Sequence, residues 1–492
     1  MRTIVREEVL LRMRAENPWW QSPNQIPSEF QKYRPRPYLK LFFPLVTKTE
    51  VRRSILLMGP RRVGKTVMIH HAIGKLIEGG TNPKMICYIS VDHPIYNGCG
   101  LETLVKDYLE ASESTALAGE RFVFFDEVQY LKDWEIHLKI LVDSSSETKY
   151  IASGSAAAAL KLRSSESGAG RFTDFLLPPL TFHEYLDLIN RTGLVHFEAK
   201  NEGSPFNFGK ANDLAALNDN FVNYLNFGGY PEVALSPTIQ ADAARFVKGD
   251  IIDKVLLRDL PSLYGIQDIQ ELNYLFTTLA YNTANEVSLE QLSTSSGVAK
   301  NTIKRYIEYL EAAFLIKIVH RLNRNAKRFQ RANFFKVYLT NPSMRSALFS
   351  PINAEHEVMG ALAETGIFAQ WFHTDFRLYY GRWDNGEVDI VALNPDQKLA
   401  WAVEVKWSDR FVDRPGELRS LMNFCRVNKL PQVAVTSRTL SATKTIDDVE
   451  ILFVPASLYC YTVGYNIVRG KNPLKQLILP EKVATTKESA LQ

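Results

Sequence analysis

The segment GPRRVGKT at residues 59–66 has the residue types and the spacing of a loop that binds nucleotide phosphates. It follows a short apolar run at residues 55–58 and precedes a segment with helical periodicity. Glycines in such a loop let backbone N–H groups turn towards phosphate oxygens, and the following helix N-terminus adds partial positive charge. We expect Lys65 to contact the β- and γ-phosphates and Thr66 to bind Mg²⁺. The nucleotide-binding residues predicted from this loop are Gly59, Arg61, Arg62, Gly64, Lys65 and Thr66.

Two acids after a second apolar run agree with this interpretation. Residues 122–125 are Phe-Val-Phe-Phe, and Asp126 and Glu127 follow them. A continuous apolar run is typical of a strand buried on both faces of a parallel sheet, and residues 85–91 predict another such strand. At the end of the first strand, Asp126 would hold Mg²⁺ and Glu127 would polarise the attacking water. The alternative is a buried strand that ends in two solvated acids.

Polar and basic residues after a further predicted strand, at residues 150–153, complete the predicted nucleotide site. This strand ends in Ser-Gly-Ser, which puts Ser153 or Ser155 where it could sense the γ-phosphate. Arg163 or Arg171 could supply positive charge to the γ-phosphate of a neighbouring subunit, which would require a homo-oligomer. Isolated arginines are also common in surface ion pairs, and this alternative stays open.

A second set of residues that could do chemistry lies in GEVDIVALNPDQKLAWAVEVK, residues 386–406. Both halves alternate apolar and polar residues, and NPDQ supplies turn chemistry between them, so the segment predicts a β-hairpin. Side chains on a strand alternate between its faces, so Glu404 and Lys406 share one face. Hairpin pairing would then bring Asp389 close to Glu404.

This arrangement is the one that a metal-dependent nuclease needs. Asp389, Glu404 and the carbonyl of Val405 would hold Mg²⁺ through hard oxygen ligands. Lys406 would orient the attacking water or help to deprotonate it, and Glu364, on a predicted upstream helix, would supply a further acid. The alternative is an ordinary amphipathic hairpin without catalytic function.

The order of the motifs along the chain resembles that of a known protein family. GPRRVGKT, FVFFDEVQYLKDWE, IASGS, AGRFTDFLLPPLTFHEYL and NFGGYPEVAL are similar to segments of bacterial and archaeal AAA+ ATPases that end in a restriction-endonuclease-like, PD-(D/E)xK, domain. The resemblance extends from about residue 52 to residue 458. It implies a P-loop ATPase core, a helical lid, a winged helix and a nuclease-like fold. The sequence departs from the PD-(D/E)xK pattern because Val388, not proline, precedes Asp389.

Length and composition fit a soluble protein of several domains. The chain has 492 residues, more than one hydrophobic core usually organises, and 46% of them are hydrophobic. We predict an α/β fold with a parallel sheet in the ATPase core. The predicted division is a basic N-terminal arm at 1–45, the P-loop AAA+ core at 46–200, a helical lid at 201–268, a winged helix-turn-helix at 269–335, a PD-(D/E)xK nuclease-like α/β domain at 336–470 and a polar tail at 471–492.

Residues 287–322 have the pattern of a winged helix-turn-helix. Gly297 and Val298 suit the tight turn, and an amphipathic helix follows them. The polar face of this helix could enter a major groove or hold phosphates, whereas the alternative is a domain that serves only for rigid packing. The predicted nucleic-acid contacts are Lys300, Asn301, Lys304 and Arg305.

The N-terminal arm is basic and contains Trp19 and Trp20. Charge and aromatic stacking could bring it to nucleic acid. Tryptophan side chains are also large and apolar, so we favour an arm that docks onto the ATPase core.

Charge, cysteines and hydropathy limit the remaining classes. A net charge of +4 is compatible with binding a polyanion but does not require it. The four cysteines lack the spacing of a disulfide framework or a zinc site. The first residues lack the apolar core of a signal peptide, and no stretch of about 18 uncharged apolar residues follows. We therefore expect a cytoplasmic protein without membrane contact.

These observations predict a protein that binds and hydrolyses ATP, with Mg²⁺, and couples the nucleotide state to cleavage or binding of DNA. One alternative is an ATP-dependent switch that binds DNA or protein and whose nuclease fold is silent. A second alternative is a motor that remodels protein partners, whose ATPase activity would not respond to nucleic acid.

Overall fold

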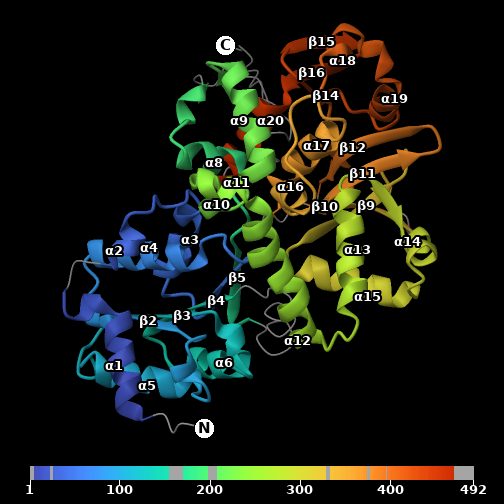
Figure 1. Cartoon of the computed structure of the whole chain (residues 1–492). Coiled ribbons are helices and arrows are strands. Elements are labelled where there is room, and N and C mark those ends of the chain that lie inside the picture. Colours follow the sequence, from blue (N-terminus) through green and yellow to red (C-terminus); the bar gives the residue numbers. More distant parts are fainter. Residues whose placement is uncertain are drawn as a thin grey trace, which may run out of the picture.

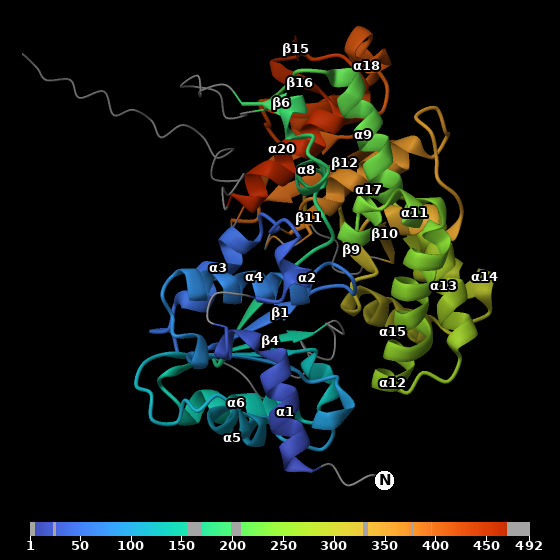
Figure 2. The same ribbon diagram turned by 60° about the vertical axis from the view of Figure 1, so that its left-hand side comes forward.

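The computed structural model describes residues 5–22, 26–154, 170–197, 208–327, 333–372, 374, 377–394 and 396–469. Two sheets organise these residues: a five-stranded parallel sheet in the N-terminal part and a nine-stranded mixed sheet in the C-terminal part. In both views the blue-to-teal elements lie on one side and the yellow-to-red elements on the other (Figure 1, Figure 2). The chain therefore has the predicted α/β fold. Within the ranges given, no helix is long and apolar enough to cross a membrane.

The parallel sheet is formed by the apolar runs that the sequence predicts, with one addition. Its strands are β1 (Ser54–Met58), β2 (Ile86–Ser90), β3 (Arg121–Asp126), β4 (Thr148–Gly154) and β5 (Phe172–Leu176), in the order β2-β3-β4-β1-β5. Its neighbouring helices and turns are α4 (Lys65–Glu78), η2 (Pro83–Met85), η3 (Pro94–Tyr96), α5 (Leu101–Ala111), η4 (Val128–Tyr130) and α6 (Trp134–Ser144). The sequence does not predict β5, whose residues are half-buried or exposed at the edge of the sheet. Because all pairings are parallel, the carboxyl ends of the strands share one edge.

The N-terminal arm packs against this sheet. It contains α1 (Arg6–Glu16), η1 (Pro18–Trp20), α2 (Ser28–Gln31) and α3 (Leu39–Thr47). Trp19 and Trp20 are buried, and the indole N–H of each donates to the carbonyl of Ile86, at 3.0 and 2.8 Å. The amide of Asn17 donates to the carbonyl of Tyr88 at 2.8 Å. The two tryptophans therefore dock the arm onto the core, as the sequence favours.

Helices connect the two sheets. They are α8 (Phe182–Leu188), η5 (Thr192–Leu194), α9 (Leu214–Phe227), α10 (Pro231–Leu235), α11 (Pro237–Ala241), the wide π-type turns η6 (Ala244–Asp253) and η7 (Val255–Asp259), and α12 (Leu260–Tyr264). A two-stranded sheet joins β6 (Val195–His196) to β7 (Lys210–Ala211). Residues 214–264 are called the helical segment below. Tyr230, in the GGYPE turn at residues 228–232, is buried in the apolar cluster that includes the strands of the parallel sheet.

The mixed sheet has the order β15-β16-β14-β13-β12-β11-β9-β10-β8. Its strands are β8 (Glu286–Ser288), β9 (Ile316–Leu322), β10 (Phe334–Leu339), β11 (Leu378–Trp383), β12 (Gly386–Leu393), β13 (Leu399–Glu404), β14 (Gln432–Ser437), β15 (Ala442–Ile446) and β16 (Val449–Pro455). The helices are α13 (Ile269–Tyr281), α14 (Leu289–Ser296), α15 (Lys300–Ala312), α16 (Ser343–Leu348), α17 (Met359–Ala369), α18 (Arg410–Asp413), η8 (Pro415–Glu417), α19 (Arg419–Val427) and α20 (Ala456–Val468). The predicted hairpin is β12–β13, and the predicted helix pair is α14–α15, which meet at Gly297.

The structure does not separate the parts that the sequence places on either side of residue 335. The expected boundary falls inside β10, and β9 pairs in parallel with β11, so a single sheet runs through both parts. The core also crosses the other expected boundaries, because α8 and α9 share one apolar cluster with α17 and α20. As a result, side chains from β10 can reach the carboxylates carried by α17 and β12.

Candidate functional site

The loop between β1 and α4 has a backbone that only glycine permits at two positions. A Cβ atom at Gly59 would lie 2.2 Å from the carbonyl oxygen of Leu177, which is closer than any real contact. Gly64 has φ of 91°, a left-handed conformation, and immediately precedes α4. Side chains are strained in this region of φ. The two glycines of the predicted loop are therefore required by the local backbone.

The loop side chains and the acid of β3 form one hydrogen-bonded group. The ammonium of Lys65 donates to the carbonyls of Gly59 and Pro60 at 3.1 and 2.9 Å. The hydroxyl of Thr66 donates to Asp126 Oδ2 at 2.7 Å, and the hydroxyl of Tyr88 donates to the same oxygen at 3.0 Å. Burial lowers the pKa of Lys65. Tyr88 is a contact that motif reasoning misses, since it lies on the neighbouring strand β2 with no motif of its own.

The end of β4 also supports Asp126. The hydroxyl of Ser153 donates to Asp126 Oδ1 and accepts from the backbone N–H of Glu127 at 3.2 Å. Burial, and then the negative charge of Glu127, raise the pKa of Asp126. Glu127 has left-handed backbone angles, φ of 55° and ψ of 46°, and the amide of Gln129 donates to its carboxylate. Ser153 therefore lies beside the two acids, and its role as a sensor of the γ-phosphate stays a prediction.

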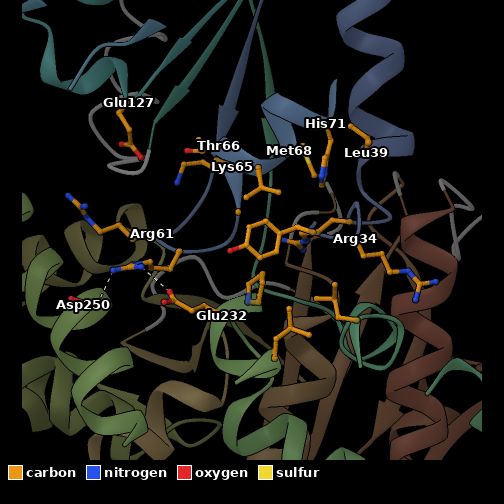
Figure 3. A pocket seen from close by; sticks show the side chains of 18 of the residues that line it. Arg34, Leu39, Arg61, Lys65, Thr66, Met68, His71, Glu127, Glu232 and Asp250 are labelled. Atoms are coloured by element: carbon orange, nitrogen blue, oxygen red, sulfur yellow. Dashed lines mark hydrogen bonds and ion pairs between the residues drawn. The ribbon is translucent and has the colours of Figure 1, made fainter. Parts of the chain in front are cut away.

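Lys65, Thr66 and Glu127 border a cavity of about 690 Å³, a size suited to a nucleotide. Figure 3 shows Lys65, Thr66 and Glu127 on one side of this cavity, and Glu232 and Asp250 from the helical segment on the opposite side. An ammonium, a hydroxyl and two carboxylates are the groups that hold triphosphate and Mg²⁺. The residues present thus fit ATP with its magnesium ion.

The two loop arginines lie at the cavity but pair with acids of the helical segment. Arg61 makes a two-point ion pair with Asp259, at 2.8 and 2.9 Å. Arg62 contacts Glu232 at 2.9 Å and Asp250 at 3.0 Å. These contacts tie the phosphate-binding loop to the helical segment, which the sequence motif does not predict.

Another arginine near the loop is buried and was not singled out by motif. Arg36 of the N-terminal arm pairs with Glu184 on α8 at 2.8 Å and donates to the carbonyls of Val63 and Pro178, at 2.8 and 2.9 Å. It therefore joins the arm, the loop and α8.

The other predicted γ-phosphate contacts have different outcomes. Ser155 and Arg163 lie outside the residues that the structure describes. Arg171 directly precedes β5 and pairs with Asp143 at 2.9 Å. Since β5 runs parallel to β1, Arg171 lies at the edge of the sheet opposite the loop. It does not join the site of its own chain, and its predicted role towards a neighbouring subunit stays a prediction.

The hairpin β12–β13 brings together the residues predicted from its sequence. The Asp389 carboxylate accepts from the backbone N–H of Val405 at 2.8 Å. The ammonium of Lys406 lies 2.7 Å from Glu404 Oε1 and 3.7 Å from Asp389 Oδ2. Glu364 on α17 is buried, and the hydroxyl of Tyr338 donates to it at 2.6 Å.

A second lysine, Lys336 on β10, lies among the same carboxylates. Its ammonium is 2.9 Å from Glu364, 2.7 Å from Glu387 and 3.6 Å from Asp389. Burial acts to lower the pKa of Lys336, but the negative charge of Glu364 and its other neighbours raises it well above its usual range, so it stays charged. A lysine in the apolar strand FFKVYL is a signal that sequence reasoning could use. We call Lys336, Glu364, Glu387, Asp389, Glu404 and Lys406 the acidic site.

Burial raises the pKa of two carboxyl groups in the acidic site. Burial, and then the charge of Asp389, raise the pKa of Glu364 to about 7 and that of Glu404 to about 8. Glu404 Oε2 is buried without a hydrogen-bond partner. Asp389 and Glu404 thus offer the oxygen ligands that Mg²⁺ prefers. However, among the residues described, no three His, Cys, Asp or Glu side chains gather as a metal-binding group.

The residues predicted to contact nucleic acid lie on one exposed face of α15. Lys300 pairs with Glu290 at 3.0 Å, and Lys304 lies 4.0 Å from Glu308. The face is solvent-accessible, as predicted, and carries acids as well as bases. Its residues are Lys300, Asn301, Lys304 and Arg305.

Two family models match parts of the chain. A model described as an AAA domain matches residues 51–186, the span of the parallel sheet and its loop. The chain contains an AAA-type P-loop ATPase domain. An AAA domain implies ATP binding, and the groups around the cavity fit that ligand. A model described as a domain of unknown function (DUF8612) matches residues 218–355, and thus ends before the strands that carry Asp389 and Glu404.

Similar proteins extend over most of the chain. An uncharacterized protein of Methanocaldococcus jannaschii, MJ1544, is 23% identical over 83% of this chain and 88% of its own length. An uncharacterized protein of Haemophilus influenzae is 21% identical over 81% of this chain and 92% of its own. Among solved structures, the Walker-type ATPase paby2304 of Pyrococcus abyssi is similar over 65% of this chain and 99% of that chain, with 14% identity and a TM-score of 0.39.

Proposed function

We propose that this ATPase couples its nucleotide state to Mg²⁺-dependent cleavage of DNA at the acidic site. The observation that carries the proposal is the convergence of four side chains: Asp389 on β12, Glu404 at the end of β13, Lys406 two residues after β13, and Glu364 on α17. Carboxylates and a lysine in contact are the groups that phosphodiester hydrolysis uses. The exposed lysines and arginine of α15, Lys300, Lys304 and Arg305, support a nucleic-acid substrate.

At the nucleotide site, each residue has a role that follows from its position. Lys65 lies at the loop carbonyls and can swing to the β- and γ-phosphates, where its positive charge offsets the developing negative charge. Thr66 and Asp126 would hold Mg²⁺, which would offset negative charge on the phosphates. Glu127 faces the cavity and would orient the attacking water. Ser153 keeps Asp126 in place for this work.

At the acidic site, Asp389 and Glu404 would hold the metal, which supplies a Lewis acid for the phosphodiester. Lys406, in contact with Glu404, would orient the water for in-line attack. Glu364 is linked to Asp389 by Lys336, whose ammonium contacts both carboxylates. This assignment keeps the four roles that the hairpin sequence predicts.

The contacts of Arg61 and Arg62 supply a route from nucleotide to helical segment. Phosphate groups in the cavity compete with Asp259, Glu232 and Asp250 for the two guanidinium groups, because all are anions that bind arginine. ATP binding would therefore loosen the helical segment from the loop, and hydrolysis would restore the contact.

A second function is favoured by a specific observation. Lys336 lies among three carboxylates, and the described residues contain no group of three metal-ligating side chains. A site of this composition is also suited to a nuclease fold that is silent, in an ATP-dependent switch that binds DNA or protein.

Cleavage assays decide between the two. We expect Mg²⁺- or Mn²⁺-dependent cleavage of single- or double-stranded DNA, assayed with and without ATP, to be lost in Asp389→Ala. Asp384→Ala, a matched change of an exposed acid in the turn before β12, should leave cleavage intact. If ATP controls the acidic site, Lys65→Ala abolishes ATP hydrolysis and alters the ATP dependence of cleavage. ATP hydrolysis without cleavage under any of these conditions would establish the switch.

A further inference from the structure

Lys336 has an unusual position for a lysine, since only 2% of its side chain is exposed. Its ammonium lies at the point where the carboxylates of Glu364, Glu387 and Asp389 meet, 2.7 to 3.6 Å from each. Buried carboxylates that converge in this way need a positive charge among them. In this chain a tethered ammonium from β10 takes that place.

The two lysines of the acidic site divide its carboxylates between them. Lys336 contacts Glu364, Glu387 and Asp389, whereas Lys406 contacts Glu404 and Asp389. Asp389 is the carboxylate that both lysines share. Any divalent ion that takes Asp389 as a ligand must therefore compete with an ammonium group on each side of it.

The site nevertheless has an unused ligand position. Glu404 Oε2 is buried and has no partner within the described part of the chain, and only 8% of Glu404 is exposed. A buried carboxylate oxygen without a partner is unfavourable unless something binds it. This oxygen indicates that the acidic site accepts a further cation, beside the one that Lys336 supplies.

We propose that Lys336 is an internal counter-cation that holds Asp389 and Glu364 and keeps a divalent metal ion from them, so that metal binds tightly only when Lys336 is withdrawn. The proposal deepens the proposed function, because it assigns a control to the same site and rests on Asp389 and Glu404 as metal ligands.

The position of Lys336 in the fold indicates which movement would withdraw its ammonium from the carboxylates. β10 pairs with β8 and β9, which flank α14 and α15 in the chain, and α15 carries the exposed face with Lys300, Lys304 and Arg305. A shift of these elements moves β10 relative to α17 and β12, which carry the carboxylates. Under this proposal, nucleic acid that engages the α15 face would raise the metal affinity of the acidic site by drawing Lys336 away from the carboxylates.

Binding of Mn²⁺ without nucleotide or DNA tests the proposal directly. We expect Lys336→Met to bind Mn²⁺ about tenfold or more tightly than the unmodified protein, in calorimetry or by electron paramagnetic resonance, because one positive charge leaves the ligand group. The gain should vanish when Asp389→Asn is added. Any Mn²⁺ bound at the nucleotide site stays in both proteins, so the difference reports the acidic site alone.

Loss of Lys336 leaves buried carboxylates without their partner, which can prevent folding. A second comparison uses the single variant Glu364→Gln and the double variant Glu364→Gln with Lys336→Met. The double variant loses one negative and one positive charge, so the net charge of the site is unchanged. Thermal unfolding checks that both proteins are folded. The pair should show the same gain in Mn²⁺ affinity. Equal or weaker Mn²⁺ binding after removal of Lys336, in a folded protein of either series, overturns the proposal.

Failure of the proposed function gives a different result. Tighter Mn²⁺ binding by Lys336→Met, with no DNA cleavage by any variant, would support Lys336 as a counter-cation and refute the proposed nuclease function. Cleavage by the unmodified protein, with Mn²⁺ affinity unchanged in Lys336→Met, would support the proposed nuclease function and refute the role of Lys336 as a counter-cation.

Discussion

Replacing Asp259 by asparagine should make ATP bind more tightly. Asp259 holds Arg61 of the phosphate-binding loop in a two-point ion pair, and the side chains are only 14% and 21% exposed. A shielded, two-point pair of this kind contributes about 1–2 kcal/mol. ATP phosphates have to displace Asp259 to gain Arg61, so removing the carboxylate returns that free energy to binding. The dissociation constant for ATP should fall by about 5- to 30-fold.

The assay is calorimetric titration with a non-hydrolysable ATP analogue. Asp253→Asn, in η6 of the same helical segment, removes a carboxylate that has no ion pair within the described ranges, and controls for the general change in charge. Asp250→Asn should have a smaller effect, about twofold, because its pair with Arg62 is more exposed. Unchanged or weaker binding by a folded Asp259→Asn protein would refute the competition between acid and phosphate.

Three further changes have defined outcomes. Trp19→Ala should destabilise the protein by about 3–5 kcal/mol in urea unfolding, because the indole is fully buried, whereas Leu11→Ala on the exposed side of α1 should have little effect. Tyr88→Phe removes one donor to Asp126 and should slow steady-state ATP hydrolysis about fivefold, with Mg²⁺ dependence shifted to higher concentration. The pKa of Glu404 rises from 4.5 to about 8 on folding, so the folded state binds more protons in that interval and stability should fall as pH rises from 5 to 8. Glu404→Gln should reduce this slope in thermal unfolding, and an unchanged slope would contradict the pKa assignment.

Local patterns were sufficient to predict much of the nucleotide site. The apolar runs that form β1, β3 and β4 are buried on both faces, so they read as continuous hydrophobic segments, and the polar residues follow them directly. Since strands in a parallel sheet end at one edge, Lys65, Asp126 and Ser153 meet there. The edge strand β5 could not be predicted in this way, because its residues are half-buried or exposed and do not form a continuous hydrophobic segment.

Long-range contacts could not be predicted in this way. Arg61 and Asp259 are separated by 198 residues, and no local sequence pattern predicts that they form an ion pair. Lys336 reaches the acidic site only because β9 pairs with β11, a register that depends on the whole sheet. The hairpin, in contrast, fixes Asp389 opposite Glu404 through its own alternation, which is why the sequence alone places those two acids together.

The positions of these long-range contacts suggest how the two sites communicate. Asp250, the partner of Arg62, belongs to η6, which packs against α16. α16 follows β10 in the chain, and β10 carries Lys336. The GGYPE turn contacts the same connection, because a Cβ atom at Gly229 would lie 2.4 Å from Asn341, between β10 and α16. A phosphate that takes Arg62 from Asp250 would therefore act on an element that touches the segment after Lys336, and the proposed metal affinity of the acidic site would then respond to the nucleotide state. Coupling of this kind requires that Asp250→Asn change Mn²⁺ binding at the acidic site more than Asp253→Asn does.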